Sequence, residues 1–213
     1  RFMQPLLDTM INQPDAHSFC ENLRDRSGLT ADYGRDNYIF RFRFYQEYLA
    51  GMQLIREVSE KPGRMDDIIN YFNNDWWEEV LRFFISKSDG VIFDNFIANF
   101  FDSDHSKNLN ANKQNLLLTL VREAPQKRLD AFKECLSNEN LGPNRTRYVL
   151  DCLRTIGTLG VVDLLIEYLE KEDTADANLD YINDLVSGFN PVSDAKIKHK
   201  IGLIHLKRGN FKK

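Results

Sequence analysis

Cysteine and histidine, the side chains best suited to bind a metal or to act as nucleophiles, are few and widely separated in this chain. The cysteines lack any C-x-x-C spacing, which disfavours a zinc site and a disulfide framework and predicts buried thiols at Cys20, Cys135 and Cys152. The histidines form no H-E-x-x-H motif, and His199 and His205 stand six residues apart, so they do not share one face of a helix. We therefore predict no metal site.

Recognisable catalytic motifs are also missing from the sequence. It contains no G-x-x-x-x-G-K-[ST] loop, no G-x-G-x-x-G loop, no G-x-S-x-G turn, and no kinase or zincin signature. Paired acids do occur, at Asp66 and Asp67 and at Glu78 and Glu79. Adjacent positions on a helix point in different directions, so neither pair can converge on one substrate. The sequence predicts no catalytic residue and no enzymatic activity for this chain.

Positive charge is concentrated at the C-terminal end. From Ser193 onward seven Lys or Arg stand against one acid, which gives +6; because the whole chain carries −4, residues 1–192 carry −10. The basic residues that could contact phosphates or an acidic neighbour are Lys196, Lys198, Lys200, Lys207 and Arg208. The alternative is a solvated helix face whose partner charges lie elsewhere. The acidic body disfavours nucleic acid as a partner.

One short stretch has the period of a strand rather than of a helix. Every second residue is aromatic, at Tyr38, Phe40, Phe42 and Phe44. This alternation predicts a strand with its aromatic side chains on one buried face and with Arg41 and Arg43 on the other. Because "GLT" and the turn-forming "ADYGRDN" precede it, we predict a hairpin near residues 28–43.

The rest of the sequence is helical in its pattern. Apolar residues recur at three- and four-residue spacing, and Pro, Gly and Asp mark the ends of the segments. Asp75 is the expected cap of the helix that follows it. The predicted helices are 2–12, 16–26, 44–59, 65–72, 76–84, 91–101, 113–123, 126–137, 144–156, 161–171, 175–187 and 194–207.

The domain organisation follows from this order of elements. Residues 144–171 read as a HEAT-type helical hairpin with glycines at its turn, and the predicted class is mainly α, with a small β-hairpin followed by a HEAT-like solenoid or bundle. We predict a segment 1–62 that contains the hairpin, a helical connector 63–104, and helical repeats 113–213. The polar break from Asp102 to Lys113 is either a loop or a domain linker.

The apolar runs are far shorter than the about 20 residues of a bilayer span, and no signal peptide opens the chain. These features predict a cytoplasmic protein without a membrane segment. Because the chain begins at Arg1 and stops in a basic run, we expect it to be a fragment of a longer protein.

Residues 27–51, "SGLTADYGRDNYIFRFRFYQEYLAG", resemble the end of the winged-helix segment of NACHT-type STAND NTPases, which include the NOD-like receptors. In that family a "GLL" strand and a turn precede "Y-x-F-x-H-x-x-F-Q-E-Y-L-A-A", and a tryptophan with a following acid comes later. The positions that carry the resemblance are Tyr38, Phe40, Tyr45, Gln46, Glu47, Tyr48, Leu49, Ala50 and Trp76. The resemblance implies that segment 1–62 is a winged-helix remnant.

Phe42 stands where the family has a histidine that contacts the phosphates of the nucleotide. Phenylalanine has no hydrogen-bond donor or charge, so either Arg41 or Arg43 replaces that contact, nucleotide sensing is altered, or Phe42 belongs to the core. Gln46 and Glu47 could latch the segment to a nucleotide domain, or hold the hairpin backbone and the amides of the first helical turn.

The resemblance implies a regulatory, ligand-sensing part of a signalling or defence NTPase. ATP or ADP and magnesium would bind in an upstream NTPase domain, which would be its first partner, and the parent would oligomerise on activation. An unknown protein or ligand would bind the helical repeats. The alternative is an α-solenoid scaffold that binds protein or nucleic acid without a nucleotide switch.

Overall fold

The computed structural model describes residues 12–13, 15–34 and 37–170, together with short helical pieces at 181–182, 195, 197–199 and 202–203. The predicted helices 2–12, 175–187 and 194–207 lie wholly or mostly outside these residues. The chain divides into two compact units, Arg1–Ala50 and Gly51–Lys213. The prediction of a mainly helical fold with one small β-hairpin is confirmed.

The first unit contains a helix and the predicted hairpin. Helix α2 (Ala16–Asp25) begins where Asp15 accepts hydrogen bonds from the amides of His17 and Ser18. Strand β1 (Thr30–Asp32) pairs antiparallel with β2 (Tyr38–Phe40). The guanidinium of Arg24 on α2 lies 2.9 Å from a carboxylate oxygen of Asp32, and this ion pair ties the helix to β1.

Helix α3 (Arg43–Glu60) follows the hairpin and continues from the first unit into the second. The next helices in the chain are α4 (Met65–Tyr71), α5 (Glu78–Lys87), α6 (Gly90–Asp102), α7 (Ala111–Glu123), α8 (Asp130–Ser137), α9 (Pro143–Ile156) and α10 (Leu159–Leu169). Short 3-10 turns lie at Pro62–Arg64, Asp75–Trp77 and Asp104–Ser106. Most of these helices begin or end within three residues of the predicted bounds.

Helix α8 starts four residues later than predicted because the chain after Pro125 forms a loop. In this loop the ammonium of Lys127 donates to the carbonyl of Ala124, 2.6 Å away, and so satisfies a carbonyl at the end of α7.

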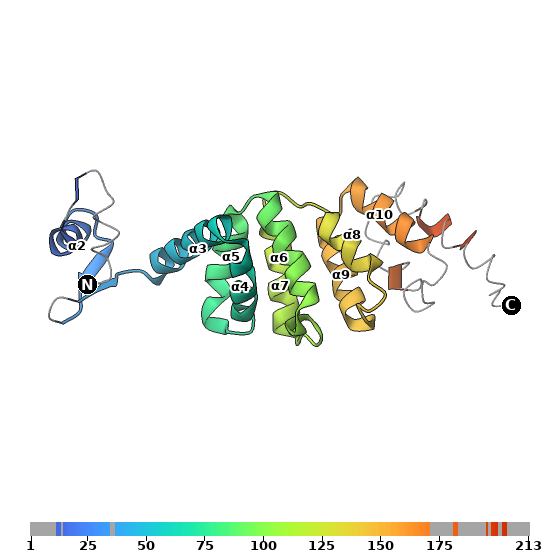
Figure 1. The fold of residues 1–213 in the computed structure, drawn as a ribbon, viewed down its shortest axis with the longest axis horizontal. Helices are drawn as coiled ribbons and strands as arrows, with labels where there is room; N and C mark the ends of the chain where they lie inside the picture. Colours follow the sequence, from blue (N-terminus) through green and yellow to red (C-terminus); the bar gives the residue numbers. More distant parts are fainter. Residues whose placement is uncertain are drawn as a thin grey trace. The chain divides into compact units, whose positions relative to one another are not determined.

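Helices of the second unit pack against their next-but-one neighbours in the sequence. α4, α6, α8 and α10 form one series of contacts, and α5, α7 and α9 form another. Figure 1 shows α8 and α9 next to each other, and these two helices are also in contact. Two layers of helices with mostly local contacts are the arrangement of an α-solenoid.

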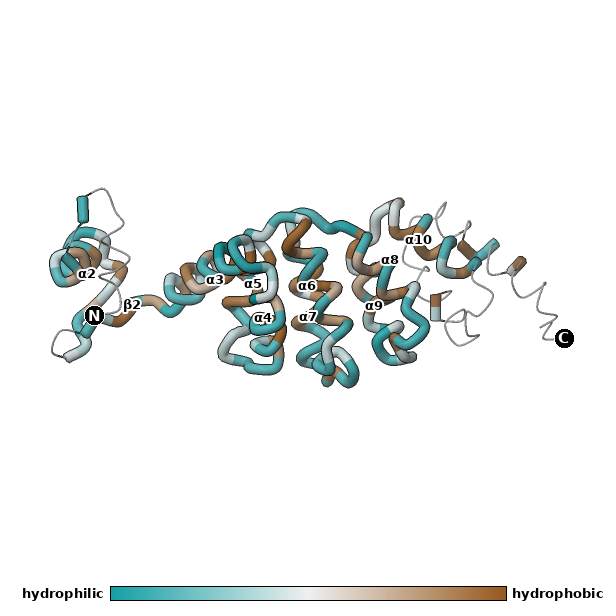
Figure 2. Tube along the Cα trace, in the orientation of Figure 1, coloured by the Kyte–Doolittle hydropathy of each residue, from teal (hydrophilic) through white to brown (hydrophobic). Residues whose placement is uncertain are grey.

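The core of the second unit is rich in phenylalanine. Helix α6 is buried nearly all round, as its composition predicts, and contributes Phe93, Phe96 and Phe100. Phe100 lies 4.6 Å from Phe72, and Phe93 lies 6.2 Å from Phe132 on α8, measured between ring centroids. Hydrophobic and hydrophilic residues alternate along the flanking helices (Figure 2), so each presents one apolar side to this core.

The polar stretch between α6 and α7 is a packed loop inside the second unit. Ser106 is buried and donates to the carbonyl of Phe101. The ring nitrogens of His105 lie 2.9 Å from the side-chain oxygen of Asn70 and 2.7 Å from the side-chain nitrogen of Asn73. These contacts hold the loop against α4 and the residues that follow it.

Candidate functional site: the hairpin and the start of helix α3

The strand that carries the family pattern is shorter than predicted. β2 ends at Phe40, a bend follows at Arg41 and Phe42, and α3 begins at Arg43. The prediction that Phe42 and Phe44 continue a buried aromatic face is wrong, because their side chains are 62% and 57% exposed. Once the helix starts, the side-chain period changes from two to 3.6 residues, so alternate residues no longer share a face.

Glu47 is the buried polar residue of this junction. Only 9% of its side chain is exposed, and one carboxylate oxygen accepts a hydrogen bond from Nε of Arg43 over 2.5 Å. The pair is four residues apart on one helix, which is the spacing for a favourable contact. Glu47 therefore has a side-chain partner rather than the backbone amides that sequence reasoning gave it. Gln46, beside it, is exposed.

Of the two arginines proposed to replace the family histidine, Arg43 is held by Glu47. The side chain of Arg41 is exposed, and its backbone amide donates to the carbonyl of Leu29, 2.9 Å away. This backbone bond fixes the chain just after β2. Arg41 is thus better placed than Arg43 to present a guanidinium to a ligand.

Four large apolar side chains around the start of α3 face solvent: Phe42, Phe44, Tyr45 and Leu49. The ring of Tyr45 meets the other two rings edge-on, at 6.1 Å from Phe42 and 5.7 Å from Phe44 between centroids. Tyr48, one of the positions that carry the resemblance, is half-buried. The matched residue Phe40 is also half-buried, at the end of β2.

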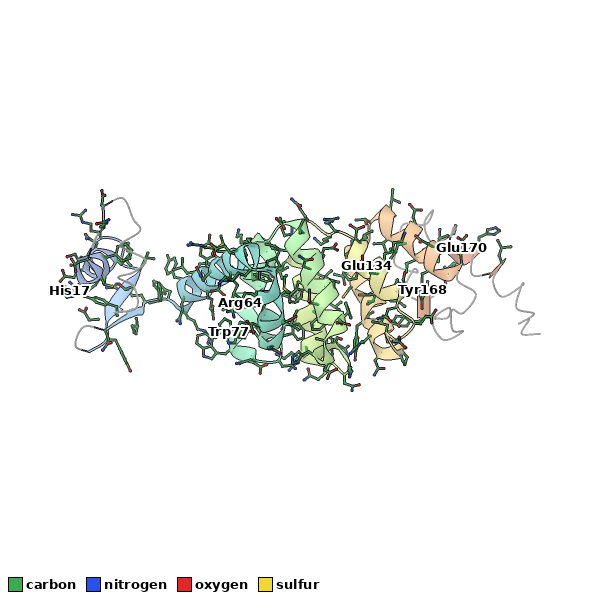
Figure 3. The ribbon with its side chains drawn as sticks, in the orientation of Figure 1. His17, Arg64, Trp77, Glu134, Tyr168 and Glu170 are labelled. Carbon is green, nitrogen blue, oxygen red and sulfur yellow. The ribbon has the colours of Figure 1, made fainter. Side chains whose placement is uncertain are left out.

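The tryptophan of the family pattern lies in the second unit. Trp76 is 49% exposed, and its backbone amide donates to the side chain of Asn74. Asn74, not Asp75, is therefore the cap at this point. The ring of Trp77 stacks on Tyr71 at 4.0 Å, in the region of α4 and α5 shown in Figure 3.

Nothing in the sequence indicated a buried lysine that forms an ion pair with the carboxylate of Asp75. The side chain of Lys113 on α7 is 8% exposed, and its ammonium lies 2.7 Å from Asp75 and 2.9 Å from Glu78. Burial alone would lower the pKa of Lys113, but its hydrogen bonds to the two carboxylates outweigh burial and raise the pKa. The cluster joins α7 to the start of α5, and its charges are already paired, so we assign it a structural role.

Of the predicted basic patch, only Lys198 is among the described residues, where it is exposed beside the buried Ile197. Lys196, Lys200, Lys207 and Arg208 lie outside them.

The thiols of Cys135 and Cys152 are buried, as predicted, and burial raises the pKa of Cys135 to about 12 and the pKa of Cys152 well above its usual value. Cys20 is half-buried. In the described part of the chain, no group of three or more His, Cys, Asp or Glu side chains could hold a metal ion.

Comparison of the chain with protein-family models, with curated proteins and with solved structures finds no match. The resemblance at residues 27–51 therefore depends on the motif residues alone. Within the described residues, no helix combines the length and the apolar composition that a membrane span needs.

Proposed function

We propose that the chain is the hinge and sensor part of a NACHT-type signalling or defence NTPase in the cytoplasm. The observation that carries the proposal is the junction itself, in which the hairpin β1–β2 is followed at once by the 18-residue helix α3 with the "YQEYLA" pattern in its first turns. A plain α-solenoid has no need for a hairpin at this place. The parent's NTPase domain would hold ATP or ADP and magnesium, and this chain alone would not hydrolyse ATP.

Helix α3 is the element that would transmit the change of state. Residues up to Ala50 belong to the first unit and residues from Gly51 to the second, while the helix runs through both without a break. If the first unit can adopt two arrangements, a nucleotide that binds one of them more tightly would shift the population toward that arrangement. Signalling then requires that a ligand on the helical layers bias the same equilibrium.

Arg41 is the residue that we assign to the nucleotide in place of the family histidine. Phe42 is exposed but offers no donor, and Arg43 is bound to Glu47. An arginine can make two parallel hydrogen bonds to a phosphate, which makes it a fitting substitute. The Arg41→Ala variant of the parent is expected to release nucleotide about tenfold or more faster, whereas Phe42→His should slow release. Unchanged off-rates in both variants would refute this assignment.

The simplest test of the proposal is to read the gene for about 300 codons upstream of Arg1, roughly two domain lengths. A P-loop followed by a strand that ends in acidic residues is the expected result. An upstream frame without these motifs would remove the switch from the proposal.

The second candidate function is a scaffold that binds protein or nucleic acid on its helical layers. The layered packing of α4–α10 favours it, because such layers present extended surfaces. A salt titration with DNA or RNA tests the nucleic-acid version. If the affinity falls steeply with salt and charge reversal at Lys196, Lys198 and Lys200 abolishes binding, the scaffold function gains support.

A further inference from the structure

The exposed apolar face at the start of α3 has the size of an interaction surface. Its members are Phe42, Phe44, Tyr45 and Leu49, with exposed fractions of 62%, 57%, 37% and 49%. Because an aromatic side chain offers about 200 Å², the four expose on the order of 400 Å² together. An exposed apolar surface of this size on a soluble protein is often functional.

The arrangement of these side chains fits a single helix as the partner. Tyr45 and Leu49 are four residues apart on α3 and so lie on one side of the helix, and the ring of Phe42, in the bend before the helix, meets the ring of Tyr45, so the three side chains form a short row. The contacts of Tyr45 with Phe42 and Phe44 order the rings before any partner arrives, which lowers the entropy lost on binding. A stable self-dimer buries about 800 Å² on each partner, so this face is too small for a second copy.

Charge at the edge of the face favours an acidic partner. Arg41 and Arg43 stand next to its residues in the chain, whereas Glu47, the one acid between residues 41 and 52, is buried and bonded to Arg43. Phenylalanine, tyrosine and arginine are enriched in protein interfaces, while helices that lie on membranes carry several lysines or arginines along the polar face. From residue 41 to residue 52 only two basic residues are present, which favours a protein partner over a membrane surface.

We propose that Phe42, Phe44, Tyr45 and Leu49, with Arg41 at their edge, bind an acidic amphipathic helix of a partner protein. The apolar side of that helix would lie along the row, and its carboxylates would meet Arg41. Arg41 is also the residue that the proposed function assigns to the nucleotide, so a bound nucleotide and the partner helix would compete for its guanidinium. The apolar part of the surface requires neither a nucleotide nor an upstream domain, and the test below is therefore made without nucleotide.

The test measures binding of a labelled model peptide of about 18 residues, with leucines on one helical side and glutamates on the other, to the whole chain. The same peptide with lysines in place of glutamates and vesicles of phosphatidylcholine and phosphatidylserine serve as comparison probes. Tyr45→Ser and Leu49→Ser should each weaken binding of the glutamate peptide by about tenfold. Arg41→Glu should weaken it by about fivefold and reduce its dependence on salt.

Val91→Ser is the matched control, because Val91 on α6 is 54% exposed and lies outside the face. It should bind the glutamate peptide as the wild type does, and circular dichroism checks that each variant keeps its helices. The proposal is overturned if the glutamate peptide does not bind or binds no better than the lysine peptide. It is also overturned if Val91→Ser loses as much affinity as Tyr45→Ser, if only the vesicles bind, or if Leu49→Ser abolishes a dimer of the chain instead.

Discussion

Replacement of Gly51 by alanine gives a sharp test of how α3 packs in the second unit. Gly51 lies inside the helix, directly beside residues of α5. A Cβ atom at this position would lie 2.7 Å from Cβ of Phe83, 3.0 Å from the amide nitrogen of Phe84 and 3.1 Å from the carbonyl oxygen of Val80. None of these three atoms can be moved by rotating a side chain.

The expected effect of Gly51→Ala has two opposing parts. In an exposed helix interior, alanine stabilises by about 1 kcal/mol relative to glycine. Here the new methyl group needs about 3.5–4 Å from its carbon neighbour, so α3 and α5 must separate by on the order of 1 Å. Overpacking of this kind typically costs about 1–3 kcal/mol. The 2.7 Å contact with a Cβ atom puts the cost in the upper part of this range, at about 2–3 kcal/mol, so after the gain of about 1 kcal/mol we expect the variant to lower the free energy of unfolding by about 1–2 kcal/mol.

Urea unfolding followed by tryptophan fluorescence measures this change in the free energy of unfolding, and it reports on the second unit, where Gly51 lies. The only two tryptophans of the chain, Trp76 and Trp77, both lie in the second unit. Gly63→Ala is the control, because nothing lies within 4 Å of its added Cβ, and this variant should be neutral or slightly more stable. A midpoint for Gly51→Ala equal to or above that of the wild type would refute the packing described for α3.

Other predictions concern a helix cap, the buried lysine and the thiols. Asp89→Ala removes the hydrogen-bond acceptor for two backbone amides at the start of α6 and should lower the free energy of unfolding by about 1 kcal/mol. Asp130→Ala, which removes no side-chain cap bond at the start of α8, should change it little. Equal losses for the two variants in thermal unfolding would contradict this prediction. Lys113→Met should lower the free energy of unfolding by less than about 1 kcal/mol, because the carboxylates of Asp75 and Glu78 can reach solvent. Lys113→Ala also loses the buried contacts of the aliphatic part of the side chain, so in the same urea assay it should lower the free energy of unfolding by about 1–2 kcal/mol. Folding raises the pKa of Lys113, so its ion pairs should add to the free energy of unfolding fully at pH values below the unfolded-state pKa of about 10.5. This contribution should disappear as the pH rises through the folded-state pKa, and the wild type should then no longer be more stable than Lys113→Met. An aromatic disulfide reagent should label Cys20 of the native protein rapidly and the other two thiols only on unfolding; rapid reaction of a second thiol would show that the buried cysteines are accessible.

Local patterns in the sequence predict the elements well where a single period holds over many residues. Helix α3 was expected over 44–59 and is found at Arg43–Glu60, because its buried positions recur at helical spacing up to Val58. The hairpin follows from the alternation at Tyr38–Phe40 and from Gly34, whose positive φ of 76° suits a turn.

Contacts between residues far apart in the chain leave no such pattern. Lys113 lies 38 residues from Asp75, and on its own helix it is one polar residue among several. Its burial arises from the packing of α7 against α5, and no short-range signal in the sequence contains that packing. The cap at Asn74 was assigned to its neighbour for a different, local reason, because asparagine and aspartate both favour helix starts.

The error at Phe42 and Phe44 indicates why the junction is of functional interest. The sequence "RFRF" fits a strand by its period, but Arg43 and Glu47 also have the four-residue spacing of a helical ion pair, and in the structure the helix prevails. This outcome leaves two phenylalanines more than half exposed, although burial of each would stabilise the fold by about 2 kcal/mol. Exposed rings that order one another through Tyr45, beside an acid that is buried and neutralised, form a surface suited to a partner rather than to solvent.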